Sequence, residues 1–362
     1  MAGKRFRKKR NKEWKLCPLC GEPLPQGSDE RVVGKTGRAV CANCLQVSKR
    51  ILDMPRKTPH KAEGCALVTP QEMIQKLDRA IIGQEQAKRA VALAMWKQQL
   101  RVNGEPLPNT GLLLYGPTGC GKTALIREAA RIAGLPFLSF DATTLSEAGY
   151  RGRDAKDMVV DLVEQCGADR ARHGVIFLDE VDKLAALRGN EYRAVYSRGT
   201  QHSLLKLIEG ATVRVNGHPF STENILFLFG GAFSGLRKHE GSQNLIGFER
   251  VVFEPEEAPE LTVDDFVGYG MEPELMGRIG RCVPLRALGA EELRRILLES
   301  ELSVFRSYQK LFHSHGIPLE LDDGEIDELV AKALRRHTGA RGLNAMVEEW
   351  LEPKLLQLSE GA

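Results

Sequence analysis

Apolar and polar residues alternate in blocks that predict a mixture of helices and strands. From Pro70 to Leu100 the apolar residues recur at helical spacing, which predicts helix through this stretch. Gly111 to Tyr115 is a short apolar run of strand length that leads into a glycine-rich turn. Helical spacing returns from Lys122 to Ala133. This order predicts a buried strand, a tight turn and a helix in succession.

Three further apolar runs of strand length follow, and helix-like segments separate them. They cover Pro136–Phe140, Val175–Leu178 and Ile225–Phe229. Strands that alternate with helices are typical of an α/β domain, here one with a doubly wound parallel sheet. In such a sheet we expect the ligand to bind at the carboxyl ends of the strands.

The pattern changes after Pro284, where strand-like runs become rare. Glu291–Phe312 and Glu325–Leu334 alternate apolar and charged residues at helical spacing, which predicts a smaller, mostly helical domain. The acidic, proline-containing stretch Glu254–Asp265 predicts a solvated loop. The sequence contains no repeat of fixed period.

Composition and length predict several domains rather than one. The 362 residues exceed what a single core usually organises, and 42% hydrophobic with 27% charged residues is ordinary globular composition. We expect five parts, which are a basic tail (1–14), a cysteine-rich module (15–50), a linker rich in Pro, Lys and His (51–68), a large α/β domain (69–284) and a small helical domain (285–362).

The charge is small overall and uneven along the chain. The formal net charge is +3, yet residues 1–15 contain eight Lys or Arg and a single acid, Glu13. No apolar run approaches the roughly 18 residues that span a bilayer, and cysteines rather than a hydrophobic stretch follow the basic N-terminus. We therefore expect a cytoplasmic protein with no membrane partner, in which paired cysteines hold a metal rather than form disulfides.

The glycine-rich turn has the pattern of a phosphate-binding loop, and it lies between a strand and a helix as that function requires. Its glycines allow backbone N–H groups to converge on phosphates, Lys122 reaches the β and γ oxygens, and the Thr123 hydroxyl can ligate Mg²⁺. The alternative is a glycine-rich turn without function. The predicted ATP-binding residues of the loop are Gly116, Pro117, Thr118, Gly119, Cys120, Gly121, Lys122 and Thr123.

A second element of ATP chemistry follows at the end of the apolar run that starts at Val175. Asp179 and Glu180 end this run, as in a Walker B element. We expect Asp179 to hold Mg²⁺ and Glu180 to polarise the water that attacks the γ-phosphate. Paired acids at the end of a strand are also common at solvated termini, but the upstream phosphate loop favours the catalytic interpretation.

Two cysteine pairs lie near the N-terminus. Cys17 and Cys20 form one C-x₂-C pair, and Cys41 and Cys44 form the second after 20 intervening residues. This spacing is typical of a tetrahedral zinc site with four thiolates, which leaves no open position for catalysis. A module of this size buries little apolar area, so the metal would supply the missing stability. Unligated or redox-active cysteines are the alternative.

These elements, in this order, resemble the ClpX family of AAA+ protein unfoldases, from the cysteine module through Leu358. The segments that carry the resemblance are Ile82–Lys88, Asp141–Leu145, Glu147–Tyr150, Leu204–Gly210, Gly230–Phe233 and Thr338–Leu343. The resemblance implies an ATPase that forms a homo-hexameric ring and pulls on protein substrates.

Three residues outside the two ATPase elements acquire roles from the resemblance. Arg278 corresponds to the arginine finger, which reaches the γ-phosphate bound by a neighbouring subunit, and Arg341 corresponds to the second sensor of nucleotide state. Without the resemblance, each arginine would be read as an exposed ion-pair partner. Ile82, together with Ile81, corresponds to the hydrophobic box against the adenine, and a place in the apolar core is the alternative.

The family grips its substrate with loops in the axial pore. The first pore loop falls on Gly149, Tyr150, Arg151 and Gly152, where a ring per subunit makes sequence-tolerant contacts with a polypeptide. Arg151 departs from the family's valine, which implies a different charge preference. The alternatives are a surface turn, or an Arg151 that pairs with Asp154 or Asp157.

Two further pore loops also depart from the family pattern. The second corresponds to Tyr196–Gln201, whose Ser-Arg-Gly-Thr differs from the usual Ser-Gly-Glu-Gly. The third, which carries Arg-Lys-His in the family, is shortened to Asn216–Pro219. Substrate choice is therefore the property that transfers least from the family.

A tripeptide near the middle of the chain matches the one with which the family docks onto the ClpP peptidase. It consists of Ile246, Gly247 and Phe248, and it lies between the Gly-Gly-Ala-Phe segment and the acidic stretch, as in the family. Exposed apolar anchors on a loop suit binding in a cleft. Local packing is the alternative role.

The sequence thus predicts an ATP-dependent unfoldase with Mg²⁺ and Zn²⁺ as cofactors. Its expected partners are further copies of itself, protein substrates, a ClpP-type peptidase and adaptor proteins. One alternative is a free-standing remodelling chaperone without a peptidase. Another is a nucleic-acid-binding ATPase, which the zinc module and the basic residues Lys4 to Lys15 would serve.

Overall fold

The structure is a computed structural model, and it divides the chain into two compact units, residues 1–61 and 62–362. The boundary falls within the stretch predicted as a linker. The structure describes residues 17, 20, 24, 31–33, 39–46, 67–145, 153–186, 191–236 and 261–360, with the backbone alone at 31–33, 191–196 and 359–360.

In the N-terminal unit, strand β1 (Arg31–Val33) pairs antiparallel with β2 (Ala39–Cys41), and residues 42–46 are helical. The described core of this unit is small. Cys17, Leu24 and Ala39 are buried, and Val40, Cys41 and Cys44 pack against them. The described part of this unit therefore buries too little apolar area to be stable by hydrophobic burial alone.

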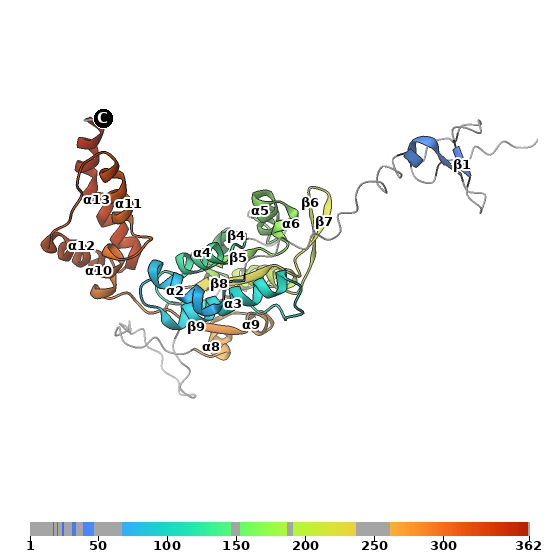
Figure 1. Cartoon of the computed structure of the whole chain (residues 1–362). Helices are drawn as coiled ribbons and strands as arrows, with labels where there is room; N and C mark the ends of the chain where they lie inside the picture. Colours follow the sequence, from blue (N-terminus) through green and yellow to red (C-terminus); the bar gives the residue numbers. More distant parts are fainter. Residues whose placement is uncertain are drawn as a thin grey trace, which may run out of the picture. The chain divides into compact units, whose positions relative to one another are not determined.

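The second unit contains a sheet of five parallel strands in the order β4-β5-β8-β3-β9 (Figure 1). The strands are β3 (Leu112–Tyr115), β4 (Phe137–Asp141), β5 (Val175–Asp179), β8 (Leu226–Gly231) and β9 (Arg281–Pro284). The doubly wound parallel α/β fold predicted from the sequence is therefore confirmed. The short strand β9, which contains an exposed arginine and a proline, was not predicted.

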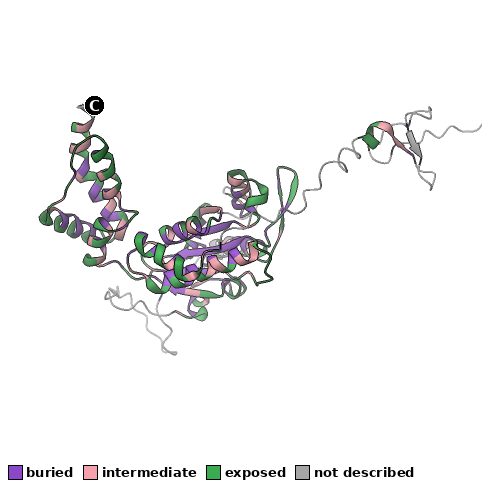
Figure 2. Ribbon diagram, viewed as in Figure 1, coloured by how far each residue is buried: buried purple, intermediate pink, exposed green. Residues whose placement is uncertain are grey.

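Alternate residues of each central strand enter two different cores, one on each face of the sheet. Leu112 and Leu114 of β3 pack with helices α2 (Pro70–Ala80), α3 (Glu85–Val102) and α4 (Lys122–Ala133). Leu113 and Tyr115 pack on the opposite face with α5 (Asp157–Cys166), α7 (Glu191–Ile208), α8 (Val263–Tyr269) and α9 (Pro273–Ile279). Figure 2 shows the central strands β3, β5 and β8 as buried, whereas the edge strands β4 and β9 are mostly half-buried or exposed. Burial on both faces explains why the strands are uninterrupted apolar runs.

The remaining elements of this domain are short. They are α6 (Ala168–Ala171), two 3₁₀ turns, η2 (Ala142–Thr144) and η3 (Val181–Leu184), and the hairpin of β6 (Thr212–Val215) and β7 (His218–Ser221). The hairpin was not predicted. Its turn is formed by Asn216 and Gly217, both with positive φ, as a two-residue hairpin turn requires.

Four helices follow the sheet and form a core of their own. They are α10 (Ala290–Leu298), α11 (Val304–Ser314), α12 (Asp323–Arg335) and α13 (Gly339–Glu360). The boundary between the two hydrophobic cores lies between Leu285, which packs against the sheet, and Leu288, which packs among these helices. The predicted helical region after Pro284 is therefore confirmed. No helix among the described residues is long and apolar enough to cross a membrane.

Two local predictions are wrong, and a third stretch contains a break that was not predicted. The helix from Pro70 to Leu100 is two helices, because the backbone at Gly83 and Gln84 is left-handed. The stretch Glu291–Phe312 is helical as predicted but contains two helices, since the Ser303 hydroxyl caps the second one by accepting from Arg306 N. The acidic stretch does not stay a loop to its end, because Asp265 is buried in α8 and accepts from Thr262 N at 2.7 Å.

Candidate active site

The predicted phosphate loop connects β3 to α4 at the carboxyl end of the sheet. The loop runs over residues 116–121, and α4 begins at Lys122. Glycine is required where the chain passes closest to other backbone. A β-carbon on Gly116 would lie 2.3 Å from the Leu285 carbonyl oxygen, and one on Gly119 would lie 1.9 Å from that of Thr338. The backbone of the loop thus packs directly against the backbone of two other segments, at Leu285 and at Thr338.

The Lys122 ammonium lies within the curve of the loop. Its Nζ donates to the carbonyl oxygens of Gly116 at 2.7 Å and Pro117 at 3.0 Å, and the side chain is 9% exposed. These acceptors are neutral. A phosphate oxygen would offer the ammonium a stronger, charge-assisted hydrogen bond at the same place.

The acidic pair lies directly opposite the start of α4. The Thr123 hydroxyl donates to Asp179 Oδ2 at 2.7 Å, and Asp179 Oδ1 accepts from Glu180 N at 2.9 Å. A hydroxyl and a carboxylate oxygen this close are the ligand types that Mg²⁺ prefers, so the residues fit that ion. Glu180 has a left-handed backbone (φ 58°), which is unusual for a residue with a β-carbon and is found disproportionately at functional sites.

These groups line one pocket of about 670 Å³. Among the predicted site residues, the lining includes Thr118, Gly119, Gly121, Lys122, Thr123, Asp179, Glu180 and Arg341. Gly116, Pro117, Cys120 and Ile82 do not line it, although all four are described. Ile82 is buried at 5% exposure, as either of its predicted roles would require. The pocket combines cations suited to phosphates with carboxylates suited to a metal ion.

Arg341 reaches the pocket from the first turn of α13. The neighbouring Ala340 N donates to the Gly119 carbonyl oxygen at 3.0 Å, which holds the start of this helix against the phosphate loop. Asn344, one turn further along α13, also lines the pocket. A helix of the small domain therefore contributes side chains to the same pocket as the loop.

Four charged residues of the pocket were not predicted as site residues, namely Arg127, Asp141, Asp182 and Lys183. Asp182 is 3% exposed; its Oδ1 accepts from Ala232 N at 3.0 Å, and its Oδ2 lies 3.2 Å from Lys183 Nζ. Hydrogen bonding and attraction to this carboxylate raise the pKa of Lys183. The signal available in the sequence was the third acid of the Asp179–Asp182 run.

Arg278 lies on α9 and does not line the pocket of its own chain. Its side chain is 59% exposed, and its Nη2 lies 2.8 Å from Glu209 Oε1. This contact agrees with the alternative stated above, in which Arg278 is an exposed ion-pair partner. The ion pair leaves the guanidinium accessible from outside the chain. A role on a neighbouring subunit stays a prediction.

The predicted first pore loop, Gly149–Gly152, lies outside the described residues, but both of its flanks are described. Leu145 and Arg153 form an isolated parallel bridge, with Arg153 N donating to Thr144 O at 3.0 Å. The Arg153 guanidinium lies 2.6 Å from Asp161 and 4.6 Å from the centre of the Phe140 ring. The ends of the loop are thus fixed side by side.

The other predicted contact loops have different outcomes. Tyr196–Gln201 is not a loop, because these residues lie in α7, where the buried Gln201 amide donates to Leu184 O at 2.8 Å and accepts from Glu272 N. Asn216–Pro219 forms the turn and the start of β7 in the exposed hairpin. The tripeptide Ile246–Phe248 lies outside the described residues.

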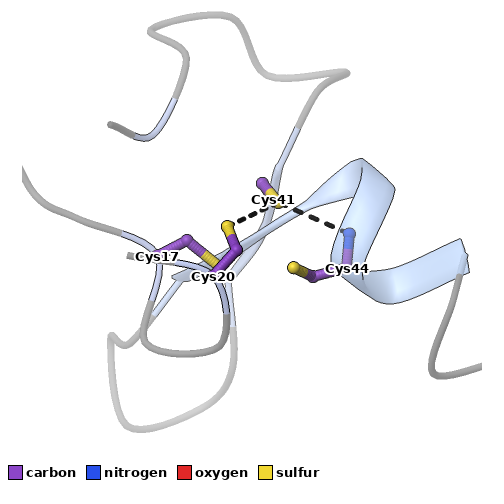
Figure 3. Close-up of side chains that lie close together, drawn as sticks. All are labelled: Cys17, Cys20, Cys41 and Cys44. Atoms are coloured by element: carbon purple, nitrogen blue, oxygen red, sulfur yellow. Dashed lines mark hydrogen bonds between the residues drawn. The ribbon is translucent and has the colours of Figure 1, made fainter. Parts of the chain in front are cut away.

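The four N-terminal cysteines converge, and Figure 3 shows their side chains gathered at the end of β2 and the helical turn after it. Their sulfurs all lie within 4.8 Å of one another, and Cys20 Sγ lies 3.8 Å from Cys41 Sγ. Zn–S bonds of about 2.3 Å in a tetrahedron would separate the sulfurs by about 3.8 Å. The donor set and its spacing therefore fit a structural zinc ion.

Protons compete with a metal for these sulfurs. Hydrogen bonds with Cys20 and Cys41 raise the pKa of Cys44 to about 12. Because zinc binds the thiolate, a bound ion would have to displace this proton. Metal binding at this cluster would therefore depend on pH.

Two family models match the chain in succession. A model of the AAA domain (Cdc48 subfamily) matches residues 107–282, and a model of the C-terminal, D2-small domain of ClpB protein matches residues 288–359. The first match contains the phosphate loop and the acidic pair, and the second contains Arg341. This division agrees with the two cores on either side of residues 285–288.

Curated relatives match nearly the whole chain. The ATP-dependent Clp protease ATP-binding subunit ClpX of Treponema denticola is 36% identical, over 92% of this chain and 88% of the relative. ClpX of Azotobacter vinelandii is 34% identical over 94% and 86%, and ClpX 2 of Wolinella succinogenes is 34% identical over 94% and 91%. Because these relatives are 34% to 36% identical over more than nine-tenths of this chain, the chain belongs to the ClpX family of AAA+ ATPases.

Proposed function

We propose that this chain is an ATP-driven protein unfoldase that works as a homo-hexameric ring and delivers substrates to a ClpP-type peptidase. The observation that carries the proposal is the pocket in which Lys122, the Asp179–Glu180 pair and Arg341 meet. These residues come from a loop, a strand and a helix of the small domain. ATP bound there would touch both domains, so its hydrolysis would change how they are held together.

The phosphate loop would bind the polyphosphate. Its backbone N–H groups and the amino-terminal end of α4 attract anions, and Lys122 would exchange its carbonyl partners for the β and γ oxygens. Thr123 and Asp179 would hold Mg²⁺, which neutralises charge on the phosphates when bound. The adenine would lie toward Ile82, as the resemblance to the family implies.

Glu180 would orient and polarise the water that attacks the γ-phosphate. It follows Asp179 directly, and its left-handed backbone turns the chain sharply at the end of β5. Arg278 of a neighbouring subunit would stabilise the charge of the transferring phosphoryl group, while Arg341 would report the nucleotide state to α13. In a closed ring every Arg278 can reach a neighbour's pocket.

The remaining predicted sites would serve substrates and partners. Tyr150 and Arg151 would contact the polypeptide in the pore, and Ile246–Phe248 would dock onto the peptidase. The relatives that match this chain are named as ATP-binding subunits of the Clp protease, which supports a peptidase partner here. The four cysteines would hold a structural zinc ion, in a module that recognises substrates or adaptors.

The proposal is tested by nucleotide binding and turnover in the full-length protein. Lys122→Ala should weaken binding of ATP and abolish hydrolysis, whereas Lys206→Ala, which changes an exposed lysine on α7, should leave both unchanged. Equal ATP affinity in the Lys122→Ala variant and the wild type would contradict the site. Co-purification with a ClpP-type peptidase then distinguishes the proposed role from that of a free-standing chaperone.

A further inference from the structure

The segment Arg79–Gln84, which joins α2 to α3, has an unusual backbone. Gly83 and Gln84 are both left-handed, with φ values of 68° and 61°. For glutamine this conformation is unfavourable, and it persists only where the surroundings impose it. The Gln84 side chain contacts the backbone of two other segments, at Arg286 and at Cys120.

The Gln84 side chain binds the residue at which the chain leaves the sheet for the small domain. Its Oε1 accepts from Arg286 N at 3.0 Å, and its Nε2 donates to Arg286 O at 2.9 Å. The amide therefore pairs with both backbone groups of Arg286, as a neighbouring strand would. Arg286 lies between the end of β9 and the start of α10.

The same amide also reaches the phosphate loop. Gln84 Nε2 lies 3.4 Å from the Cys120 carbonyl oxygen, at the long end of the hydrogen-bonding range. One side chain thus touches the nucleotide loop and the connection between the two domains. Gln84 does not line the nucleotide pocket, so any effect on the reaction would act through these two segments.

Neighbouring contacts join the same segment to the far end of α10. The Ser300 hydroxyl donates to Ala80 O at 2.5 Å, and Glu301 N donates to Arg79 O at 2.8 Å. These bonds satisfy carbonyls at the end of α2 that have no partner within the helix. The Arg79–Gln84 segment therefore binds the chain on both sides of α10, at Arg286 before the helix and at Ser300 and Glu301 after it.

We propose that Gln84 is a positioning residue that couples nucleotide binding at the phosphate loop to the 285–289 connection. The Cys120 carbonyl and the Gly121 N–H belong to one planar peptide unit, in which they point in opposite directions. A phosphate that binds this N–H fixes the direction of the carbonyl, and with it the contact to Gln84 Nε2. The inference rests on the proposed ATP binding.

The test compares amide hydrogen exchange in peptides that cover residues 116–123 and 285–289, with and without ADP and Mg²⁺. Gln84→Gly removes the amide and suits the left-handed backbone. Gln84→Glu retains the acceptor for Arg286 N but loses both donated bonds. Gln98→Ala is the matched control, since this buried α3 amide donates to His173 O at 3.1 Å and Asn224 O at 2.8 Å, away from both segments.

In the wild type and in Gln98→Ala, ADP should slow exchange in both peptides. The gain of one net hydrogen bond corresponds to about a fivefold slower amide exchange rate at residues 285–289. In Gln84→Gly and Gln84→Glu, ADP should still slow exchange at 116–123 but lose its effect at 285–289.

Two results would contradict this coupling. An effect of ADP at 285–289 that is as large in both Gln84 variants as in the wild type would overturn it and leave the proposed function intact. A wild-type phosphate loop whose exchange does not respond to ADP would overturn the proposed function and the coupling together.

Discussion

The contact between the phosphate loop and α13 is so close that one methyl group added at Gly339 should separate the two segments. Gly339, in the first turn of α13, has a φ of 53°, and a β-carbon there would lie 2.6 Å from the Gly119 carbonyl oxygen. Gly339→Ala leaves every glycine of the phosphate loop in place. It therefore tests whether α13 must stay against the loop for nucleotide to bind.

The expected magnitude has two parts. A left-handed alanine costs about 1 to 2 kcal/mol wherever it occurs. The overlap should in addition separate Ala340 N from Gly119 O, and the loss of one such hydrogen bond costs about 0.5 to 1.5 kcal/mol. Gly104→Ala is the control, because Gly104 has a φ of 97° with nothing within 4 Å of the added carbon. It isolates the backbone strain.

The assay is calorimetric titration of the full-length variants with ADP. Because Arg341 follows Ala340 and lines the pocket, Gly339→Ala should weaken ADP binding by roughly 5- to 30-fold, the equivalent of about 1 to 2 kcal/mol. Gly104→Ala should bind ADP as the wild type does. If the two variants have the same affinity, α13 does not need this contact and the reasoning fails.

Three further predictions concern the ring, the metal and the pore. Mixing Arg278→Ala subunits into wild type should depress ATPase activity more than in proportion to the mutant fraction; strictly proportional loss would refute a role on the neighbouring subunit. The zinc content should be close to one ion per chain at neutral pH and should fall on acidification, because protons compete with zinc for the thiolates and the pKa of Cys44 is raised. A Cys17→Ser variant that retains full zinc would refute the site. Substrates with acidic tails should be unfolded faster than those with basic tails, and Arg151→Val should reduce this preference; an unchanged ranking would exclude a role of Arg151 in charge selection.

Local sequence signals predicted the bounds of the helix and the strand beside the pocket, because backbone geometry and burial leave direct signs in the sequence there. The helix from Lys122 to Ala133 has its predicted bounds, since left-handed glycines, Gly121 and Gly134, stand at both ends. Asp179 ends a strand buried on both faces, so the apolar run stops where the chain reaches the pocket.

The predictions failed where distant parts of the chain decide the structure. The break between α2 and α3 is fixed by contacts of Gln84 with Arg286 and of Ala80 with Ser300. Asp182 becomes a pocket residue because Ala232, far along the chain, binds its carboxylate. Neither relationship has a periodicity or spacing that a sequence could reveal.

The central claim is that ATP hydrolysis at this pocket drives protein unfolding. The most direct measurement follows the fluorescence of a folded fluorescent protein with an unstructured tail, mixed with full-length wild type or Glu180→Gln. The role proposed for Glu180 is to orient water and not to hold the nucleotide, so Glu180→Gln should bind ATP but neither hydrolyse it nor unfold the substrate. The account predicts that fluorescence falls only with wild type and ATP. Loss of fluorescence at the same rate with Glu180→Gln, or without ATP, would contradict it.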